Sequence, residues 1–375
     1  MKTTINIFGD FVTSENMSNV AINESLKDIL SAANYNVLNY EGVLIKDAQA
    51  IVKTGPTLFQ HVSTIDWVKS QKFNLLNLAN NHTMDNGANS LIYTMSIFKN
   101  HTVGAGSWEE AYKPHIVEIN DIRIAFVSFT HCEFGVLNDE WDRNSKIGTA
   151  WINHNKVNKT ISKLKNNCDI IIALPHAGIE YEEQPLPEWR TRYRELIDLG
   201  CDAVIGSHPH IIQGCEEYKG KLICYSLGNF FFPKSITKPI SWYYSICAHL
   251  IIDENKSISY KIIPIHFDNF KIEAIDNTDT YFQDYFDRIN EELNNDDRYI
   301  DLVKTLCKTK YADYIENIGS KELIPLRINE RFIKRLIRYI LGKKDGSVAS
   351  MLNVIRCESH RFCFLRGLKL LNNIQ

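Results

Sequence analysis

Short apolar runs alternate along the first 230 residues with segments whose apolar side chains recur at helical spacing. This pattern predicts strands at residues 4–8, 36–39, 74–78, 116–119, 123–129, 169–174, 203–205 and 222–226, and helices at residues 24–33, 62–71, 90–100, 155–165 and 188–199. Strands that alternate with helices are typical of an α/β protein. We therefore expect an α/β fold with one mixed sheet, or two sheets, and helices on the outside.

The pattern changes near residue 268. Two further strands, at residues 245–252 and 257–263, precede this point, and the segments after it are predicted to be mainly helical, at residues 280–292, 298–308, 329–341 and 348–356. The chain of 375 residues is long enough for a large domain with an addition. We expect an α/β domain at residues 1–268 and a helical extension at residues 269–375.

Composition and charge narrow the class of protein. A hydrophobic fraction of 44% with 23% charged residues is that of a globular protein and excludes fibrous or wholly disordered chains. The formal charge of −3 excludes a uniformly basic nucleic-acid binder, and we expect no nucleic-acid partner. The charge is uneven, because residues 325–375 hold 11 Lys and Arg against 3 Asp and Glu, which leaves −11 for residues 1–324.

Two features indicate a reducing compartment. The N-terminal residues MKTTINIFGD lack the apolar stretch of a signal peptide, and no run of about 18 apolar residues predicts a membrane span. The nine cysteines form no C-x-x-C pair, and many lie in strand-like apolar runs, which favours free thiols over disulfides. We expect a cytoplasmic protein.

Side chains of the kinds that bind metals follow several predicted strands directly. The carboxyl ends of strands are where α/β sheets build their sites, and divalent cations bind mixtures of carboxylate, imidazole and amide groups. The residues at these positions are Asp10, Glu41, Asn80, Asn81, His82, Asp85, His176, His208 and His210. Their shared position after strands indicates a metal site.

Each of these residues also has a purely structural interpretation. Asp10 is typical of a turn or helix cap, residues 80–82 of a loop with Asx turns, and His176 of a hydrogen-bonded core histidine. The pair His208 and His210 is more specific, since alternate residues of an extended segment around Pro209 project to one side. The remaining histidines are interpreted as ordinary surface or core residues, at positions 61, 101, 115, 131, 154, 249, 266 and 360.

The same residues lie in motifs that resemble the CapA family of poly-gamma-glutamate capsule biosynthesis proteins, which is similar in fold to calcineurin-like metallophosphoesterases. The resemblance covers about residues 7–232. The motifs are GD at residues 9–10, NYEG at 39–42, LANNHTMDNG at 78–87, GAG at 104–106, HAGIEY at 176–181, GCDAVIGSHPH at 200–210 and YSLGNF at 225–230. The resemblance implies mixed β-sheets sandwiched by helices, followed here by a mainly helical extension.

The resemblance also implies roles for individual residues. Glu41 would bridge two cations, with Asn81, His176 and His208 completing one site and Asp10 and His210 the other. His82 would protonate the leaving oxygen or stabilise the phosphoryl transition state, with Asp85 orienting its ring. Glu180, Tyr181 and Asn229 match positions beside the site and are expected to contact substrate. The implied cofactors are one or two divalent ions, of Mn, Zn or Fe.

Two departures from the family pattern affect these expectations. The segment Asp10-Phe11-Val12 lacks the histidine that metallophosphoesterases usually have two residues after the aspartate, so a single tight cation with a weak second site is an alternative to a filled pair. Ala177 replaces a usual tryptophan, and Arg190 and Arg192 lie near a usual glutamine. These replacements predict a reshaped substrate entrance.

Residues 327–344 (RINERFIKRLIRYILGKK) predict an amphipathic helix with a basic face. One interpretation is a helix packed on the catalytic domain with its basic face in solvent. Another is an interfacial helix on anionic lipid, which would place the protein peripherally at the inner face of the membrane. RNA binding is a third, with few aromatic residues to support it.

Two functions are consistent with these features. The first is a metal-dependent phosphoester hydrolase that acts in the synthesis of a capsule or envelope polymer, poly-gamma-glutamate or a glycan. The second is a non-catalytic accessory subunit that uses the metal fold to bind an anionic polymer or to aid its export. The expected partner is accordingly an anionic polymer or a small phosphorylated substrate.

Overall fold

A computed structural model describes residues 2–47, 49–142, 146–233, 238–268, 270–276, 278–318 and 347–372. The strands within these ranges form three sheets. The largest has the order β2 (Ala21–Ile22), β18 (Lys271–Ala274), β17 (Ile258–Phe267), β16 (Tyr244–Ile252), β1 (Thr3–Phe11), β3 (Tyr35–Tyr40), β4 (Leu75–Asn77), β5 (Thr102–Val103), with β15 (Asn229–Phe231) also paired to β1. Strands β1, β3, β4 and β5 run parallel, whereas β16 and β17 are antiparallel.

A second sheet of six strands faces the first. Its order is β13 (Ile212–Tyr218), β14 (Lys221–Leu227), β12 (Ala203–Ile205), β11 (Ile170–His176), β8 (Ile122–Thr130), β7 (His115–Ile119). A small third sheet contains β6 (Ala105–Ser107), β10 (Ile147–Ala150) and β9 (Val136–Leu137). Both large sheets mix parallel and antiparallel pairs, as predicted.

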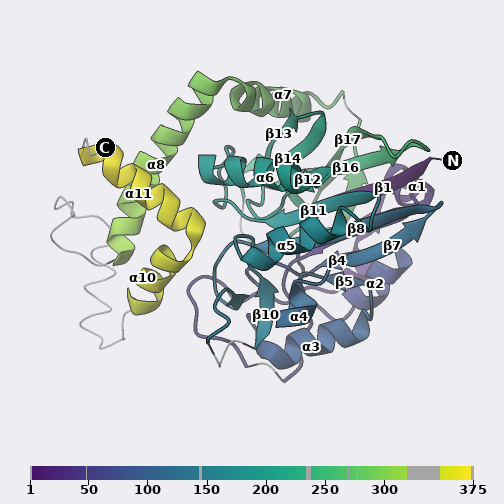
Figure 1. The fold of residues 1–375 in the computed structure, drawn as a ribbon, viewed down its shortest axis with the longest axis horizontal. Helices are drawn as coiled ribbons and strands as arrows, with labels where there is room; N and C mark the ends of the chain where they lie inside the picture. The colour runs from purple at the N-terminus through teal and green to yellow at the C-terminus, as the bar shows by residue number, and fades with distance from the viewer. Residues whose placement is uncertain are drawn as a thin grey trace.

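Helices lie outside the sheets (Figure 1). They are α1 (Glu24–Ala32), α2 (Thr64–Ser70), α3 (Gly87–Ile97), α4 (Trp108–Ala111), α5 (Asn155–Leu164), α6 (Pro187–Leu199), α7 (Thr280–Asn294), α8 (Asp296–Ile318), α10 (Ser347–Arg356) and α11 (Glu358–Asn372), with short 3-10 helices η1 (Met17–Asn19) and η2 (Ile240–Tyr243). The predicted α/β fold with a helical C-terminal part is confirmed.

Successive side chains along the central strands point to opposite faces of each sheet, so each sheet packs on the other sheet on one face and on helices on the other. In β11, Ile172 and Leu174 point into the core between the two large sheets, whereas Ile171 and Ala173 point toward α5 and α6. The opposite sheet behaves in the same way, because the face of β1 and β3 turned away from the central core packs on α1, α2 and α3. Burial on both faces explains why these strands are almost continuously apolar in sequence.

The C-terminal helices are attached to the six-stranded sheet. The side chain of Asp279 caps α7 by accepting a hydrogen bond of 2.8 Å from the Phe282 backbone N–H. The backbone N–H of Cys215 on β13 donates to Asn290 Oδ1 of α7 at 2.7 Å. Helices α8 and α11 pack together, with the rings of Tyr311 and Phe364 stacked at 5.3 Å. In Figure 1 this helical group extends from the sheets at the end opposite the N-terminus.

The strand β18 lies beyond residue 268 and pairs with β17 and β2, so the large sheet continues to Ala274 and helix begins again at Thr280. The division at residue 268 therefore falls in a turn of the sheet. Residues 327–344, with the predicted basic amphipathic helix, lie outside the described residues. All nine cysteines are free thiols, as expected.

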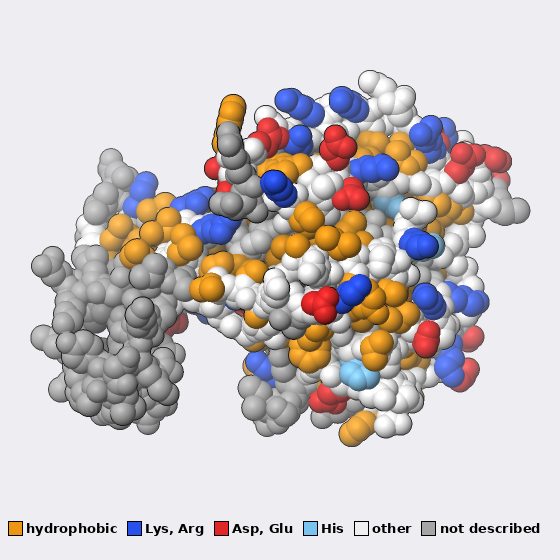
Figure 2. Space-filling model, turned by 90° about the horizontal axis from the view of Figure 1, so that it is seen from below, with side chains coloured by type: hydrophobic (Ala, Val, Ile, Leu, Met, Phe, Trp, Pro, Cys, Tyr) orange, Lys and Arg blue, Asp and Glu red, His pale blue; other side chains and the backbone are white. Residues whose placement is uncertain are grey.

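The surface of the body carries both signs of charge. Figure 2 shows Lys and Arg side chains interspersed with Asp and Glu on the face that it displays, with apolar patches between them. Among the helices in the described ranges, none combines the length and the apolar character needed to cross a membrane.

Candidate metal centre

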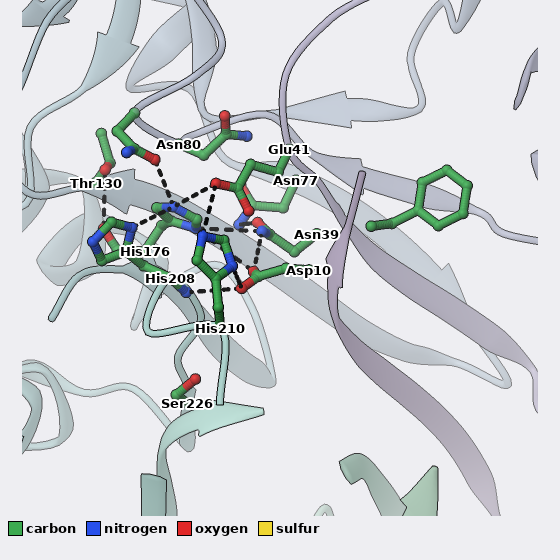
Figure 3. Close-up of polar contacts among 12 residues, drawn as sticks. Asp10, Asn39, Glu41, Asn77, Asn80, Thr130, His176, His208, His210 and Ser226 are labelled. Carbon is green, nitrogen blue, oxygen red and sulfur yellow. Dashed lines mark hydrogen bonds and ion pairs between the residues drawn. The ribbon is translucent and has the colours of Figure 1, made fainter. Parts of the chain in front are cut away.

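The predicted site residues come together where strand ends from the two large sheets meet (Figure 3). One group lies at or just after the ends of the parallel strands β1, β3 and β4, and the other lies at or just after the ends of β11 and β12. The residues are Asp10, Glu41, Asn81, His82 and Asp85 in the first group and His176, His208 and His210 in the second, and all of them are buried. The expectation that these strand ends share one location is therefore met.

Local backbone geometry brings the first strand end close to the site. A Cβ atom on Gly9 would lie 1.9 Å from the carbonyl oxygen of Gly228, so only glycine allows β1 to approach that turn. The backbone N–H of Asp10 donates to the same carbonyl at 2.9 Å. The Gly9-Asp10 motif thus places the carboxylate of Asp10 at the edge of the sheet.

The backbone of His208 and His210 differs from the prediction. An extended segment was expected, but both residues have a positive φ, of 105° and 62°. Non-glycine residues in this region are strained by about 1–3 kcal/mol each. The two rings do converge, with centroids 6.0 Å apart, but a tight turn around Pro209 rather than strand alternation brings them together.

Glu41 is at the centre of the cluster. Its side chain is fully buried, and neither carboxylate oxygen has a hydrogen-bond partner. Oε1 lies 3.8 Å from the Nε2 atoms of His82, His176 and His210. Burial raises the pKa of Glu41 well above its usual value. A buried carboxylate without partners is costly, and a bound cation would satisfy both oxygens.

Two groups of potential ligands share Glu41. Glu41, His176 and His208 form the first, and Asp10, Glu41 and His210 the second, and within each group the ligand atoms lie within 4.8 Å of one another. The Asn81 Oδ1 atom lies 3.0 Å from His176 Nε2 and so belongs to the first group. These are the groupings that the sequence motifs implied. Carboxylate, imidazole and amide donors in this number fit divalent cations.

The histidines differ in their protonation. Burial, reinforced by neighbouring histidines, lowers the pKa of His176 and of His208 well below the usual value, so both rings are neutral and offer a lone pair. Burial also acts to lower the pKa of His210, but the carboxylates of Glu41 and Asp10 outweigh it and raise the pKa to about 9. His210 must therefore lose a proton before it can bind a cation.

A chain of buried amides supports Asp10. Asn39 Nδ2 donates to Asp10 Oδ1 at 2.7 Å, and Asn77 Nδ2 donates to Asn39 Oδ1 at 2.8 Å. Ser128 Oγ in turn donates to Asn77 Oδ1. The sequence prediction missed these residues, although Asn39 and Asn77 hold the strand-end position that marked the ligands.

His82 also lies beside Glu41. Its Nδ1 atom is 2.6 Å from Asp85 Oδ2, and Nε2 is directed toward Glu41. Asp85 also accepts hydrogen bonds from Lys53 Nζ at 2.5 Å and from the Leu58 backbone N–H at 2.8 Å. Lys53 was not predicted, because a single lysine in a loop carries no pattern that distinguishes it.

The three residues expected to contact substrate occupy different positions. Asn229 is buried and bonds to His210 through Oδ1, 3.1 Å from Nδ1, so it positions that ring. Tyr181 is 40% exposed and stacks on Trp242 at 5.6 Å. Lys238 Nζ donates to the Tyr181 hydroxyl at 3.1 Å. Glu180 is half-buried, and its charge contributes to the raised pKa of Glu41.

The two arginines expected near the entrance are bound elsewhere. Arg190 pairs with Glu216 at 2.9 Å, and Arg192 donates to the Ile152 carbonyl at 2.8 Å. Both lie on α6, on the outer side of the six-stranded sheet. Their side chains are therefore engaged away from the metal-binding residues, and the reshaped entrance stays a prediction. Ala177 is buried directly after His176.

Comparison with known proteins identifies the family. The family model described as Bacterial capsule synthesis protein PGA_cap matches residues 4–234, more than half of the chain. The chain belongs to this family. The match includes all the residues of the candidate metal centre, whereas β16 and the segments that follow it lie outside it.

Two similar proteins are named for capsule or PGA biosynthesis. The chain is 29% identical over 257 residues to the capsule biosynthesis protein CapA of Bacillus anthracis, covering 63% of this chain and 61% of the relative. It is 32% identical over 179 residues to the PGA biosynthesis protein CapA of Bacillus subtilis, covering 46% of each. The chain thus spans less than two thirds of the length of either relative.

Solved structures show only distant similarity. A putative 5'-nucleotidase from Staphylococcus aureus matches with a TM-score of 0.47 and 13% identity, over 77% of this chain and 58% of that one. The NAD nucleotidase of Haemophilus influenzae matches with a TM-score of 0.41 and 12% identity, over 92% of this chain and 67% of that one. The family assignment rests on the sequence match.

Proposed function

We propose that this PGA_cap protein is a metal-dependent phosphoester hydrolase that acts in the synthesis or trimming of a capsular or other envelope polymer. The observation that carries the proposal is the buried carboxylate of Glu41, which has no hydrogen-bond partner and is shared by two groups of ligands. Two cations held in this way would supply Lewis-acid stabilisation of phosphate oxygens and a nucleophile at neutral pH.

The residues around the cations have distinct tasks. Glu41, Asn81, His176 and His208 would hold one cation, and Asp10, Glu41 and His210 the other. The Nε2 atom of His82 faces Glu41, and Asp85 holds the opposite ring nitrogen. This places His82 to donate a proton to the leaving oxygen, or a hydrogen bond to the charge that develops there.

The rim of the centre is consistent with an anionic substrate. Lys238 lies 4.8 Å from the ring centroid of Tyr181 and 4.7 Å from that of Trp242, so a cation sits on two aromatic rings close to His210. We infer that this rim binds an anionic polymer or a small phosphorylated substrate. The names of the two Bacillus relatives support poly-gamma-glutamate capsule synthesis as the setting.

A non-catalytic accessory role is the second candidate. The observation that favours it is Val12, which is buried and apolar at the place where related phosphoesterases have a histidine. The second group of ligands therefore has three side chains. In this alternative the centre would bind an anionic polymer, or help its export, without turnover.

Metal content and hydrolysis, measured on the same full-length preparation, test the proposal. The protein would be loaded with Mn, Zn or Fe and assayed with a nitrophenyl phosphodiester and a nitrophenyl phosphomonoester. We expect stoichiometric metal and turnover that falls about 100-fold or more in His82→Ala. His101→Ala serves as the control, because His101 is exposed and bonds to the Asn74 carbonyl away from the centre. Metal without turnover favours the accessory role, and no stoichiometric metal refutes both.

We also propose that residues 327–344 bind an anionic membrane surface, which would place the protein peripherally at the inner face. Deletion of the C-terminus is a poor test, because Glu358 and Ser359 are buried in contacts with the catalytic body. A better variant replaces Arg331, Lys334, Arg335 and Arg338 with glutamine. Equal sedimentation of both proteins with phosphatidylserine vesicles would refute the proposal.

A further inference from the structure

A third group of metal-binding side chains lies beside the candidate centre and shares no residue with it. A ring nitrogen of His131, a carboxylate oxygen of Glu133 and the sulfur of Cys357 lie within 4.8 Å of one another, and all three residues are buried. The sequence prediction treated His131 as an ordinary histidine and gave Glu133 and Cys357 no role. The group therefore requires its own explanation.

Distant parts of the chain build this group. His131 and Glu133 directly follow β8, whereas Cys357 lies between α10 and α11 in the C-terminal extension. The residue after Cys357 anchors it, because Glu358 accepts hydrogen bonds from the Cys132 backbone N–H at 3.0 Å and from Trp151 Nε1 at 2.8 Å. The sulfur is thus held against His131 and Glu133 by neighbouring contacts.

One nitrogen of His131 has a partner and the other has none. Nδ1 lies 2.9 Å from Ser359 Oγ, which also accepts a hydrogen bond of 2.9 Å from Trp189 Nε1. A serine oxygen can accept two hydrogen bonds, so Nδ1 can carry the proton and leave the lone pair on Nε2. Nε2 is buried and has no hydrogen-bond partner. This matches the arrangement in metal-binding histidines, whose other ring nitrogen is held by an outer partner.

We propose that His131, Glu133 and Cys357 bind a third divalent cation, of the zinc class. Thiolate, imidazole and carboxylate together favour zinc or cobalt over the harder magnesium and calcium ions, which prefer oxygen ligands. Binding would replace the thiol proton of Cys357, which passes to solvent. The proposal concerns a site distinct from the catalytic one and does not depend on phosphoesterase activity.

The third site would connect the C-terminal helices to the wall of the candidate centre. The rings of His131 and His208 are in edge-to-face contact, with centroids 4.5 Å apart. A cation on His131 would therefore fix a ring that packs against a ligand of the first group. The helical extension would in this way support the centre as well as cover the six-stranded sheet.

Cobalt substitution of the full-length protein tests the third site directly. The candidate centre contains no sulfur ligand, so a thiolate-to-cobalt charge-transfer band in the near ultraviolet can report this site separately. We expect the wild-type protein to show the band and Cys357→Ser to lose both the band and one equivalent of cobalt. Cys363→Ser is the matched control, because Cys363 is a buried free thiol on α11 outside the group, and it should change neither readout.

A second variant keeps the test decisive if Cys357→Ser does not fold. Glu133→Gln retains the thiol and should lower cobalt affinity at the third site at least tenfold, with the charge-transfer band appearing only at higher cobalt concentration. Glu41→Gln should leave the band unchanged while it reduces binding at the candidate centre. Any one of three results would overturn the proposal. The band could be absent from the wild-type protein, Cys363→Ser could lose the band and the cobalt as Cys357→Ser does, or Glu133→Gln could bind cobalt unchanged.

Discussion

Lys53 Nζ lies 2.5 Å from Asp85 Oδ1, and both side chains are almost completely buried. The ion pair holds the carboxylate that orients His82, and Lys53 Nζ also lies 3.2 Å from His82 Nδ1, so Lys53 acts on the chemistry by holding these two side chains. Removing one partner of a buried ion pair leaves the other charge uncompensated. Lys53 is therefore a positioning residue of the proposed hydrolase.

Replacing Lys53 should reduce turnover more than substrate binding. We expect Lys53→Met to lower kcat about 10- to 100-fold with little change in KM, because the ring of His82 loses its fixed orientation. Lys53→Arg, which retains the charge, should recover part of the rate. Steady-state kinetics of both variants check this, and equal losses in the two, or a change confined to KM, would contradict the positioning role.

Replacing Glu41 should weaken metal binding but stabilise the metal-free protein. Glu41→Gln removes the shared carboxylate and should weaken both cations, whereas Asn81→Ala should weaken only the first. In metal-free protein the same Glu41→Gln change removes a buried carboxylate whose oxygens have no hydrogen-bond partner, so we expect the free energy of unfolding to rise by about 1–3 kcal/mol. Urea unfolding in chelator measures this, and a decrease in stability would show that Glu41 is not an unsatisfied ligand.

Metal binding should release protons. In the metal-free protein the carboxylates raise the pKa of His210 to about 9, and burial raises the pKa of Glu41, so at pH 7.5 this pair holds at least one proton that a cation must displace. Affinity should therefore rise with pH up to about 9. Calorimetry in two buffers of different ionisation enthalpy counts the protons, and zero net release would contradict the pKa assignment of the pair.

Acid should destabilise the C-terminal helices through His360. Burial lowers the pKa of His360 to about 4, with the charge of Glu180 opposing this effect and that of Lys310 adding to it. Between pH 6.5 and pH 4 the unfolded chain binds a proton that the folded protein does not, so stability falls as the pH falls through this window. Protonation of His360 in the unfolded chain should lower the free energy of unfolding by about 1–2 kcal/mol between pH 7 and pH 5.

The variant His360→Phe isolates this contribution. It keeps a ring against Tyr314, 5.1 Å away in the wild type, but cannot titrate. Urea unfolding at pH 7 and pH 5 should show a smaller loss of stability in the variant than in the wild type. An identical loss in both proteins would mean that His360 takes no part in acid destabilisation.

Glu358 should be essential for attaching the helical extension. Its carboxylate is 2% exposed and accepts three hydrogen bonds, from the Cys132 backbone N–H, Trp151 Nε1 and Asn153 Nδ2. Glu358→Gln turns an N–H group toward these donors and should cost about 2 kcal/mol. Limited proteolysis should then cut the extension faster, and Glu254→Gln, a change at a surface turn, should not alter the rate. Unchanged proteolysis and unfolding in Glu358→Gln would contradict this anchoring role.

The elements of the fold that were predicted from the sequence share one physical feature, which is burial on both faces. Strands such as β11 are buried on both faces and end at a polar residue, so their apolar runs are unambiguous. The strand β13 was missed because Gly214, Glu216 and Glu217 interrupt its apolar pattern. The two-residue strand β9 was missed because it is too short to show any alternation.

The site was predicted to the extent that its residues lie in local motifs. Asn81, His82 and Asp85 share one turn, and the spacing of His208 and His210 was visible, although the backbone that brings them together was not. Lys53 and Cys357 reach their partners only through tertiary folding, so no local pattern marks them. The single sequence did not reveal the contacts between segments that lie far apart along the chain.

Diffraction from crystals soaked with Mn²⁺ and a phosphate mimic tests the central claim most directly. If the protein is the proposed hydrolase, we expect two anomalous peaks, one on each side of the Glu41 carboxylate. One peak should lie against His176 and His208 and the other against Asp10 and His210. The anion should lie within hydrogen-bonding distance of His82 Nε2. Crystals that bind the anion elsewhere and show no anomalous peak beside Glu41 would contradict it.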